Sequence, residues 1–325
     1  MLLKKGSRGE DVRLLQKGLA AFGYGTHPGS ADGVFGRRTK EALEDWQTKV
    51  GTYPDGIFGR GSLKAWNAEC AKKGLDDFKF NTTPSAPDPV DNGDKLTWVR
   101  CKSDKVGKGY SSCTLRSDTA TAYNALAQEV RALGGVVTSA GGKRGLSSKA
   151  SPSRSKKSFH YTGRAFDLAL PTGMQNPSKD PYIVVRDESG NGRKWTVWCK
   201  VLDENAPGAD SVETVTLDAC YVVGKRSSSG KRYTQLQYKE WTGKAFNFTE
   251  LAEKNGFERI SGRRSFFKGG SYGGAEWWHF QWEEGMVKGQ TTFGEELLKV
   301  YTLDQCKAFV YWDVAKDCKF GINWF

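Results

Sequence analysis

Histidine is scarce in this chain, with only three residues among 325. Long hydrophobic runs are missing as well: none approaches the ~20 residues that a transmembrane helix needs, so a helical membrane protein is excluded. Zinc-finger cysteine spacing, aromatic RNA-binding signatures and heptad repeats are also absent, so no motif favours nucleic acid as a partner. The first residues lack the apolar stretch and the cleavage site of an export signal. These absences leave a globular protein, which we expect to be a monomer.

Positive charge is in excess. Lysine and arginine together number 49 against 37 aspartate and glutamate residues, a formal net charge of +12. Such a charge suits an anionic partner, and nucleic acid, a membrane surface and the anionic polymers of a bacterial wall all qualify. Net charge alone does not choose among these partners.

The seven cysteines form no Cys-x-x-Cys motif. If they form disulfides, the protein works in an oxidising place such as a periplasm or outside the cell. The alternative is a cytosolic protein with seven reduced thiols, and sequence alone does not decide the connectivity. The local pairs that we expect are Cys101 with Cys113, Cys199 with Cys220 and Cys306 with Cys318, with Cys70 left free.

An internal repeat occupies the start of the chain. Residues 31–43 recur as residues 54–66, and each copy reads Asp-Gly, an apolar pair and a second glycine. This order is typical of a turn that feeds a helix. Apolar residues at helical spacing between positions 12 and 22 predict another helix before the first copy. The sequence therefore predicts a three-helix domain over residues 1–73.

The rest of the chain is of a different kind. Residues 74–95 lose periodicity and contain a Pro-rich stretch, which predicts a semi-extended linker. Residues 96–325 then mix helical and strand-like patterns, so we expect the α+β class. A strand-rich insertion of about residues 171–245 interrupts this second domain.

Two of the three histidines lie in short stretches that also hold carboxylates. His160 and Asp167 share the stretch 158–167, and His279 ends the run Glu276-Trp277-Trp278-His279. Neutral imidazole nitrogens and one carboxylate oxygen are the ligand set of a catalytic zinc that keeps a fourth position open. The alternative is two ordinary half-buried histidines and two solvated carboxylates.

Glu276 remains as a carboxylate beside the metal that does not bind it, so it can act as a general base. Alternation around Asp167 places that residue on one face of a strand. Residues three apart in a strand face opposite sides, so the chain must bend between Glu276 and His279 for both to meet one metal.

These two stretches resemble the paired signatures of the zinc D-alanyl-D-alanine carboxypeptidases and dipeptidases. The resemblance implies a zinc peptidase domain with a central antiparallel sheet and helices, in which His160, Asp167 and His279 hold zinc and Glu276 is the base. The residues that carry it are Ser158, His160, Gly163, Ala165 and Asp167, together with Glu276-Trp277-Trp278-His279.

The same family places an arginine near the substrate carbonyl, upstream of the first signature. Arg144 is the best match, although its surroundings depart from the usual pattern. We also expect Ser158 and Trp278 to contact the substrate. Three nearby basic residues compete with Arg144 for its role: Lys143, Arg154 and Arg164.

The three-helix domain resembles the peptidoglycan-binding domain that is often joined to wall hydrolases. The alternative is a helical module that binds no wall. Arg37, Arg38 and Arg60 stand where loops meet helices, and helix N-termini there add their own preference for anions. We therefore expect these arginines to contact carboxylates of the wall.

Together these features predict a zinc-dependent peptidoglycan hydrolase that cuts an amide bond of the stem peptide, as a D-Ala-D-Ala carboxypeptidase or an endopeptidase. The alternative is a non-enzymatic, zinc-containing scaffold that binds the wall. We expect action at the cell wall, in the periplasm or outside the cell. Without an export signal, a phage endolysin released by holin-type lysis or an effector delivered by a secretion machine is favoured over a housekeeping enzyme.

Overall fold

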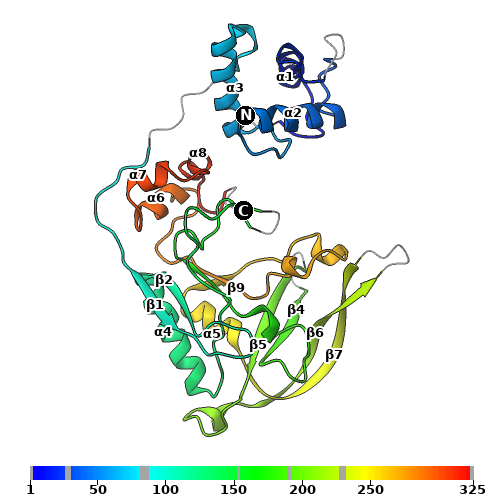
Figure 1. The fold of residues 1–325 in the computed structure, drawn as a ribbon. Coiled ribbons are helices and arrows are strands. Elements are labelled where there is room, and N and C mark those ends of the chain that lie inside the picture. The colour runs from blue at the N-terminus through cyan, green and yellow to red at the C-terminus, as the bar shows by residue number, and fades with distance from the viewer. Residues whose placement is uncertain are drawn as a thin grey trace. The chain divides into compact units, whose positions relative to one another are not determined.

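The protein divides into two compact units, Met1–Asp88 and Pro89–Phe325 (Figure 1). Helices and antiparallel sheets occur together, which confirms the α+β class. No helix in the described part of the chain is long and apolar enough to cross a bilayer. The fold is taken from a computed structural model, which describes residues 3–25, 31–80, 88–151, 154–188, 192–226 and 232–322.

The first unit holds three helices: α1 (Glu10–Ala21), α2 (Arg37–Lys49) and α3 (Arg60–Lys73). A glycine precedes each of α2 and α3 as the N-cap residue, as the repeat predicted. Gly33 and Gly56 of the two Asp-Gly turns have φ angles of 73° and 65°. A side chain is rarely accommodated in this left-handed region, which explains why both copies carry glycine there.

A buried glutamine fastens each turn of the repeat to the helix before it. Gln47 Nε2 donates to Asp55 Oδ1 at 3.1 Å and to Ser62 Oγ at 2.9 Å, and Gln47 Oε1 accepts from the Gly56 amide at 2.9 Å. Gln16 makes the corresponding bonds in the first copy. The repeat is therefore held by polar contacts as well as by its apolar pairs.

The first unit extends beyond residue 73, where the sequence predicted its end. A short 3-10 turn, Asp76–Phe78, follows α3, and Trp66 Nε1 donates to the Phe78 carbonyl at 2.8 Å. Phe80 is only 3% exposed and belongs to the same apolar core. The aromatic side chains need this core for burial, so residues 74–80 fold with the helices.

The end of the predicted linker belongs to the second unit. Asp91 Oδ2 accepts from the Leu303 amide at 2.9 Å, and the Leu96 amide donates to the Lys299 carbonyl at 2.7 Å. Most of the Pro-rich stretch, residues 81–87, lies outside the described residues. The linker is thus shorter than residues 74–95.

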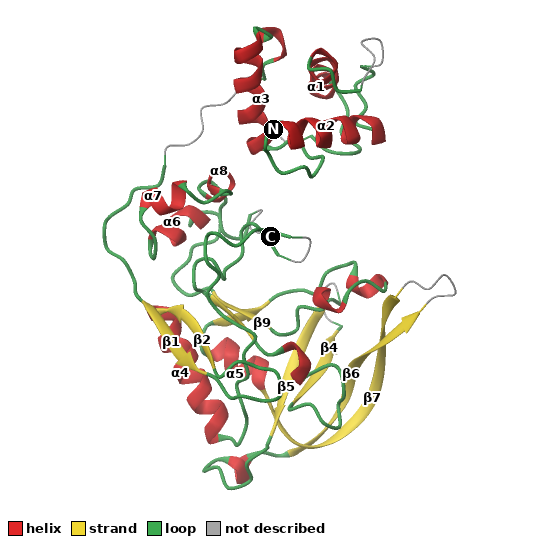
Figure 2. Ribbon diagram, in the orientation of Figure 1, coloured by secondary structure: helices red, strands yellow, loops and turns green. Residues whose placement is uncertain are grey.

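The second unit contains three antiparallel sheets in place of one central sheet (Figure 2). Strand β3 pairs with β9, and β9 pairs with β8. The predicted insertion forms a separate four-stranded sheet in the order β4-β5-β7-β6. The strands are β1 (Trp98–Lys102), β2 (Ser112–Arg116), β3 (Ala165–Asp167), β4 (Tyr182–Asp187), β5 (Lys194–Lys200), β6 (Thr214–Arg226), β7 (Arg232–Asn247), β8 (Phe257–Arg259) and β9 (His279–Trp282).

Five α-helices among the described residues complete this unit. The helix α4 (Ser117–Ala132) buries Tyr123, Leu126 and Val130 in a core that also receives residues of all three sheets. Three short helices near the C-terminus form a second core with residues 159–165. The remaining helices are α5 (Phe248–Lys254), α6 (Phe293–Leu298), α7 (Leu303–Lys307) and α8 (Trp312–Ala315).

All seven cysteines are buried thiols, so the three expected disulfides are not formed in the structure. Cys101 does face Cys113 across β1 and β2. Cys199 instead faces Phe246 of β7, and Cys220 faces Tyr238 of the same strand. Cys199 and Cys220 therefore lie on two strands that flank β7, opposite positions that are eight residues apart, and they are not cross-strand neighbours.

Candidate metal centre

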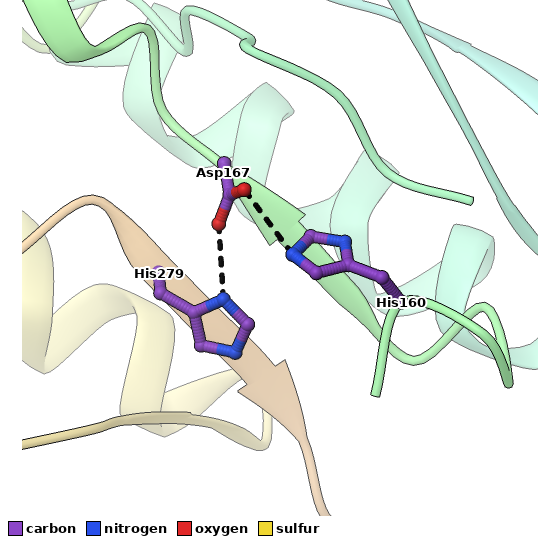
Figure 3. Close-up of side chains that lie close together, drawn as sticks. All are labelled: His160, Asp167 and His279. Atoms are coloured by element: carbon purple, nitrogen blue, oxygen red, sulfur yellow. Dashed lines mark hydrogen bonds and ion pairs between the residues drawn. The ribbon is translucent and has the colours of Figure 1, made fainter. Parts of the chain in front are cut away.

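The pairing of β3 with β9 brings Asp167 directly opposite His279. Directly opposed residues of an antiparallel pair project from the same face, so the two side chains can meet. His279 Nδ1 lies 3.0 Å from Asp167 Oδ1 (Figure 3). Two residues that are more than a hundred positions apart thus become neighbours through one short ladder.

His160 approaches from the turn that precedes β3. Its Nδ1 is 2.6 Å from the Gly142 carbonyl, and its Nε2 is 3.2 Å from Asp167 Oδ2. A carbonyl can only accept, so Nδ1 carries the proton and Nε2 keeps its lone pair. Nε2 is buried and has no hydrogen-bond partner of acceptable geometry within the described ranges. An imidazole held in this way is prepared to bind a metal.

The donor atoms of His160, Asp167 and His279 all lie within 4.8 Å of one another. The two histidines are 4% and 7% exposed, and Asp167 is half-buried. Two nitrogens and one oxygen at this spacing fit a zinc ion. The Asp167 carboxylate lies against both imidazole rings and is charged at neutral pH, as an aspartate ordinarily is. The charged carboxylate therefore attracts a cation.

Glu276 lies three residues before His279 and close to it, in a strained backbone. Its φ angle is 59°, and the His279 amide donates to the Glu276 carbonyl at 3.2 Å. This turn is the bend that the spacing of the two residues required. Arg263 Nε donates to Glu276 Oε1 at 2.8 Å, and the Glu276 side chain is 13% exposed. The carboxylate is oriented by an arginine and is outside the three-residue donor cluster.

The insertion sheet anchors the loop that carries Glu276. Trp195 of β5 is buried, and its Nε1 donates to the Ala275 carbonyl at 2.6 Å. Tyr272 of the same loop donates through its hydroxyl to the Gly173 carbonyl at 2.9 Å. Both bonds join this loop to residues that the sequence assigned to the insertion, so one effect of the insertion is to position the loop that leads to the candidate ligand His279.

Arg144 lies next to the first signature. Its amide donates to the His160 carbonyl at 2.8 Å, and its guanidinium is 5.3 Å from the centre of the Tyr161 ring. Burial lowers the pKa of Arg144, and Asp167 is close enough to counteract part of that effect. Nη1 of Arg144 is buried and has no hydrogen-bond partner in the described part of the protein. An unpaired donor therefore lies in the residue whose backbone bonds to His160 and whose charge acts on Asp167.

The three competing basic residues have other surroundings. Lys143 Nζ stands 3.9 Å from the centre of the Trp98 ring. Arg164 is buried and donates to Glu296 of α6 at 2.6 Å. Arg154 is exposed. Among the four candidates, Arg144 fits the expected role best.

Ser158 and Trp278, the expected substrate contacts, are both part of the scaffold. Ser158 Oγ accepts from the His160 amide at 3.4 Å, which helps to shape the turn. Trp278 is 5% exposed and packs against the rings of Tyr272 and Trp277. Their contact with substrate stays a prediction.

Sequence reasoning missed two contributors, Arg263 and Gly142. Arg263 binds the Glu276 carboxylate from thirteen positions earlier in the chain. The segment between them has no helical or strand periodicity from which this contact could be predicted. Gly142 acts through its backbone carbonyl, and a carbonyl leaves no side-chain signature. The Gly-Gly pair before Lys143 was the only available hint of a close backbone approach.

Residues 8–65 match the family described as "Putative peptidoglycan binding domain". The chain is also 42% identical over 72 residues to "N-acetylmuramoyl-L-alanine amidase CwlL" of Bacillus licheniformis, which covers 22% of this chain and 20% of that protein. A second protein of that organism, "Probable N-acetylmuramoyl-L-alanine amidase", is 40% identical over 68 residues, or 21% and 19% of the two chains. The chain thus aligns with about a fifth of the length of these curated relatives.

Proposed function

We propose that this chain is a peptidoglycan hydrolase, in which the first unit binds the wall and the second unit is a zinc peptidase. The observation that carries the proposal is the convergence of His160, Asp167 and His279, with Glu276, a carboxylate that is not among the donors, close to His279. A purely structural zinc site has no use for such a base. The family match over residues 8–65 supports the role of the first unit.

The residues of the site divide the chemistry among them. Zinc, when bound by His160, Asp167 and His279, would acidify water and polarise the scissile carbonyl. Glu276 would accept a proton from the attacking water and later donate it to the leaving amine. Arg144 would donate a hydrogen bond from Nη1 to the scissile carbonyl oxygen, which becomes negatively charged in the transition state. Such a donor contributes about 3 kcal/mol to transition-state binding.

The bond that we propose is an amide of the stem peptide, cut by carboxypeptidase or endopeptidase action. The relatives are named as amidases, which makes the bond between the sugar and the first alanine a competing target. Their similarity spans no more than 72 residues, far less than the second unit. It therefore supports the wall-binding unit more than any choice of bond.

The test is Glu276→Gln, which keeps the shape of the side chain and removes the base. Because loss of general acid-base assistance costs roughly 10²–10⁴-fold in rate, release of fragments should fall toward the upper end of this range. Zinc content, measured by atomic emission, should stay at one per chain. Mass spectrometry of the digested wall identifies the bond.

Glu284→Gln is the matched control, because Glu284 is exposed and follows the same stretch. It should digest the wall at the wild-type rate. If wild type with bound zinc releases no fragment, the protein is a scaffold. If fragments end at muramic acid, the enzyme is an amidase, and if Glu276→Gln keeps full activity, the assigned base is wrong.

A further inference from the structure

The first unit has a groove of about 500 Å³ where its three helices end. Its walls come from the residues after α1, the last turn of α2 and the second half of α3. Three aromatic rings and three lysines line it: Phe22, Tyr24, Trp46, Lys49, Lys72 and Lys73. This volume is in the range of pockets that hold small ligands, which are typically about 300–1,000 Å³.

Trp46, which lines this groove, carries a buried hydrogen-bond donor without a partner among the described residues. The residue is 1% exposed, and its Nε1 has no acceptor among the residues that the structure describes. Trp66, which packs against it at 5.0 Å between ring centres, donates its own Nε1 to the Phe78 carbonyl. A buried N–H without an acceptor is costly, so the difference between the two indoles points to an acceptor supplied by a ligand. Because the donor is covered in the free protein, neighbouring side chains must move for a ligand oxygen to reach it.

The rim of the groove is positively charged. Lys49, Lys72 and Lys73 are all exposed. Glu69 is the one acidic residue among the lining residues, and its carboxylate lies 3.7 Å from Lys73 Nζ. A second acidic residue, Asp45, is close enough to Tyr24 to contribute, after burial and Glu69, to the raised pKa of that tyrosine. Cations thus outnumber anions, which suits a ligand that carries a carboxylate.

We propose that this groove is the peptidoglycan contact of the first unit, and that it takes an N-acetylated amino sugar with its attached peptide. The aromatic rings would cover the sugar face and the acetyl methyl group. Trp46 Nε1 would donate to an amide carbonyl, and the lysines would pair with peptide carboxylates. The inference rests on the proposed wall binding and replaces the contact surface expected from the sequence.

That expected surface lies at the opposite end of α2. Arg37 and Arg38 begin the helix and Lys49 ends it. Thirteen residues at a rise of about 1.5 Å each separate the two ends by about 18 Å. The arginines at the start of α2 and the lysines of the groove, which lie at the ends of α2 and α3, therefore make alternative predictions that substitution can separate.

The experiment uses the full chain carrying Glu276→Gln, so that the wall survives the assay. In this background, Lys72→Glu combined with Lys73→Glu reverses the charge of the groove, and Arg37→Glu combined with Arg38→Glu is the matched control. Sedimentation with insoluble peptidoglycan should show roughly tenfold weaker binding for the lysine pair, as expected for reversed charge at a complementary contact. The arginine pair should bind within about twofold of the parent.

A second arm uses Trp46→Phe and a soluble probe, N-acetylmuramyl dipeptide, followed by calorimetry. Phenylalanine keeps an aromatic ring and lacks the N–H, so affinity should fall severalfold while thermal unfolding reports whether the unit is still folded. If the first unit of the Trp46→Phe variant is unfolded, the sedimentation result for the lysine pair decides whether the groove is the contact surface. An oligomer of N-acetylglucosamine, which has no carboxylate, should bind more weakly than the muramyl peptide.

The outcomes separate this inference from the proposed function. If the parent does not sediment with the wall, wall binding itself is wrong. If the parent sediments and the lysine pair binds equally well, or if only the arginine pair binds weakly, the groove is not the contact surface. Equal affinity for both soluble probes would exclude the role of the lysines.

Discussion

At the residue scale, Glu276 combines strain with precise orientation. A residue with a side chain in the left-handed region costs on the order of 1–3 kcal/mol, which the surrounding contacts must offset. Here Arg263 holds the carboxylate, and Trp195 holds the preceding carbonyl. Such strain is often found where a functional side chain must point in a particular direction.

We predict that Arg263→Gln lowers kcat about tenfold, because loss of a positioning contact misplaces the base by a fraction of an ångström. KM and zinc content should change little, since Arg263 is not among the metal donors. Steady-state kinetics with a stem peptide measures both constants. Arg264→Gln is the control, because Arg264 is adjacent and exposed. Equal kinetics for both variants would show that Arg263 has no positioning role.

At the scale of elements, the positions of the candidate metal ligands depend on one loop and one ladder. The ladder of β3 and β9 aligns Asp167 with His279, and the loop before β3 places the Gly142 carbonyl on His160. The loop runs alongside β3, because the Asp167 amide donates to the Gly141 carbonyl at 2.9 Å. A small displacement of this loop would therefore shift both His160 and Asp167, two of the three candidate ligands.

Gly142→Ala tests that dependence. A Cβ at Gly142 would lie 2.4 Å from the Thr114 carbonyl oxygen, so the backbone has to shift and the His160 ring loses its fixed orientation. We expect zinc affinity to fall by about 10–100-fold, as for other changes behind a metal ligand. Competition with a chelator measures it. Gly145→Ala, with its nearest neighbour at 3.8 Å, should bind zinc as wild type does.

The boundary of the first unit gives another prediction at this scale. A fragment of residues 1–73 lacks Phe80 and the carbonyl that accepts from Trp66. Loss of a buried aromatic side chain costs about 3–5 kcal/mol, so this fragment should be much less stable than residues 1–88. Circular dichroism during heating compares the two. Identical melting would mean that residues 74–80 contribute nothing to the core.

At the scale of the whole molecule, Glu296 ties distant parts of the second unit together. Its side chain is fully buried, and Oε2 accepts from Arg116 Nη1 at 2.8 Å and from Arg164 Nε at 2.6 Å. Arg116 ends β2, and Arg164 directly precedes β3, which carries Asp167. Helix α6 is therefore connected to the strand that carries Asp167, a candidate metal ligand.

We predict that Glu296→Gln lowers the free energy of unfolding by about 3–5 kcal/mol at pH 7, because it removes the carboxylate that pairs with buried Arg164 and one of the two carboxylates that pair with buried Arg116. Burial alone would raise the pKa of Glu296, but Arg164, Arg116 and Lys299 outweigh it and lower that pKa. The stabilisation is thus present above the unfolded value of about 4.3 and is lost as pH falls through the lower folded value.

Urea denaturation at a series of pH values checks this prediction. The gap between wild type and Glu296→Gln should be constant near neutrality and should narrow only below about pH 4. Glu295→Gln, at the exposed neighbouring position, should leave stability within about 0.5 kcal/mol of wild type. A gap that does not change down to pH 2 would contradict the assigned role of the ion pairs.

The sequence by itself determined the helices of the first unit, the α+β class and the candidate ligands His160, Asp167 and His279. These conclusions depend on local patterns: a repeat, an alternation, and scarce histidines that occur beside carboxylates. Local interactions decide such features, so they can be read along the chain.

Only the tertiary structure decided which arginine has an unpaired donor: Arg144 Nη1 has no partner among the described residues, whereas Arg164 is paired with Glu296. It also decided that Arg263 binds the Glu276 carboxylate and that the described strands of the second unit form three sheets. It also revealed the groove at Trp46 and the inclusion of Phe80 in the first core. Each of these depends on side chains that packing brings together from 13 to more than a hundred positions apart. No periodicity encodes such contacts, because they arise from how whole elements pack.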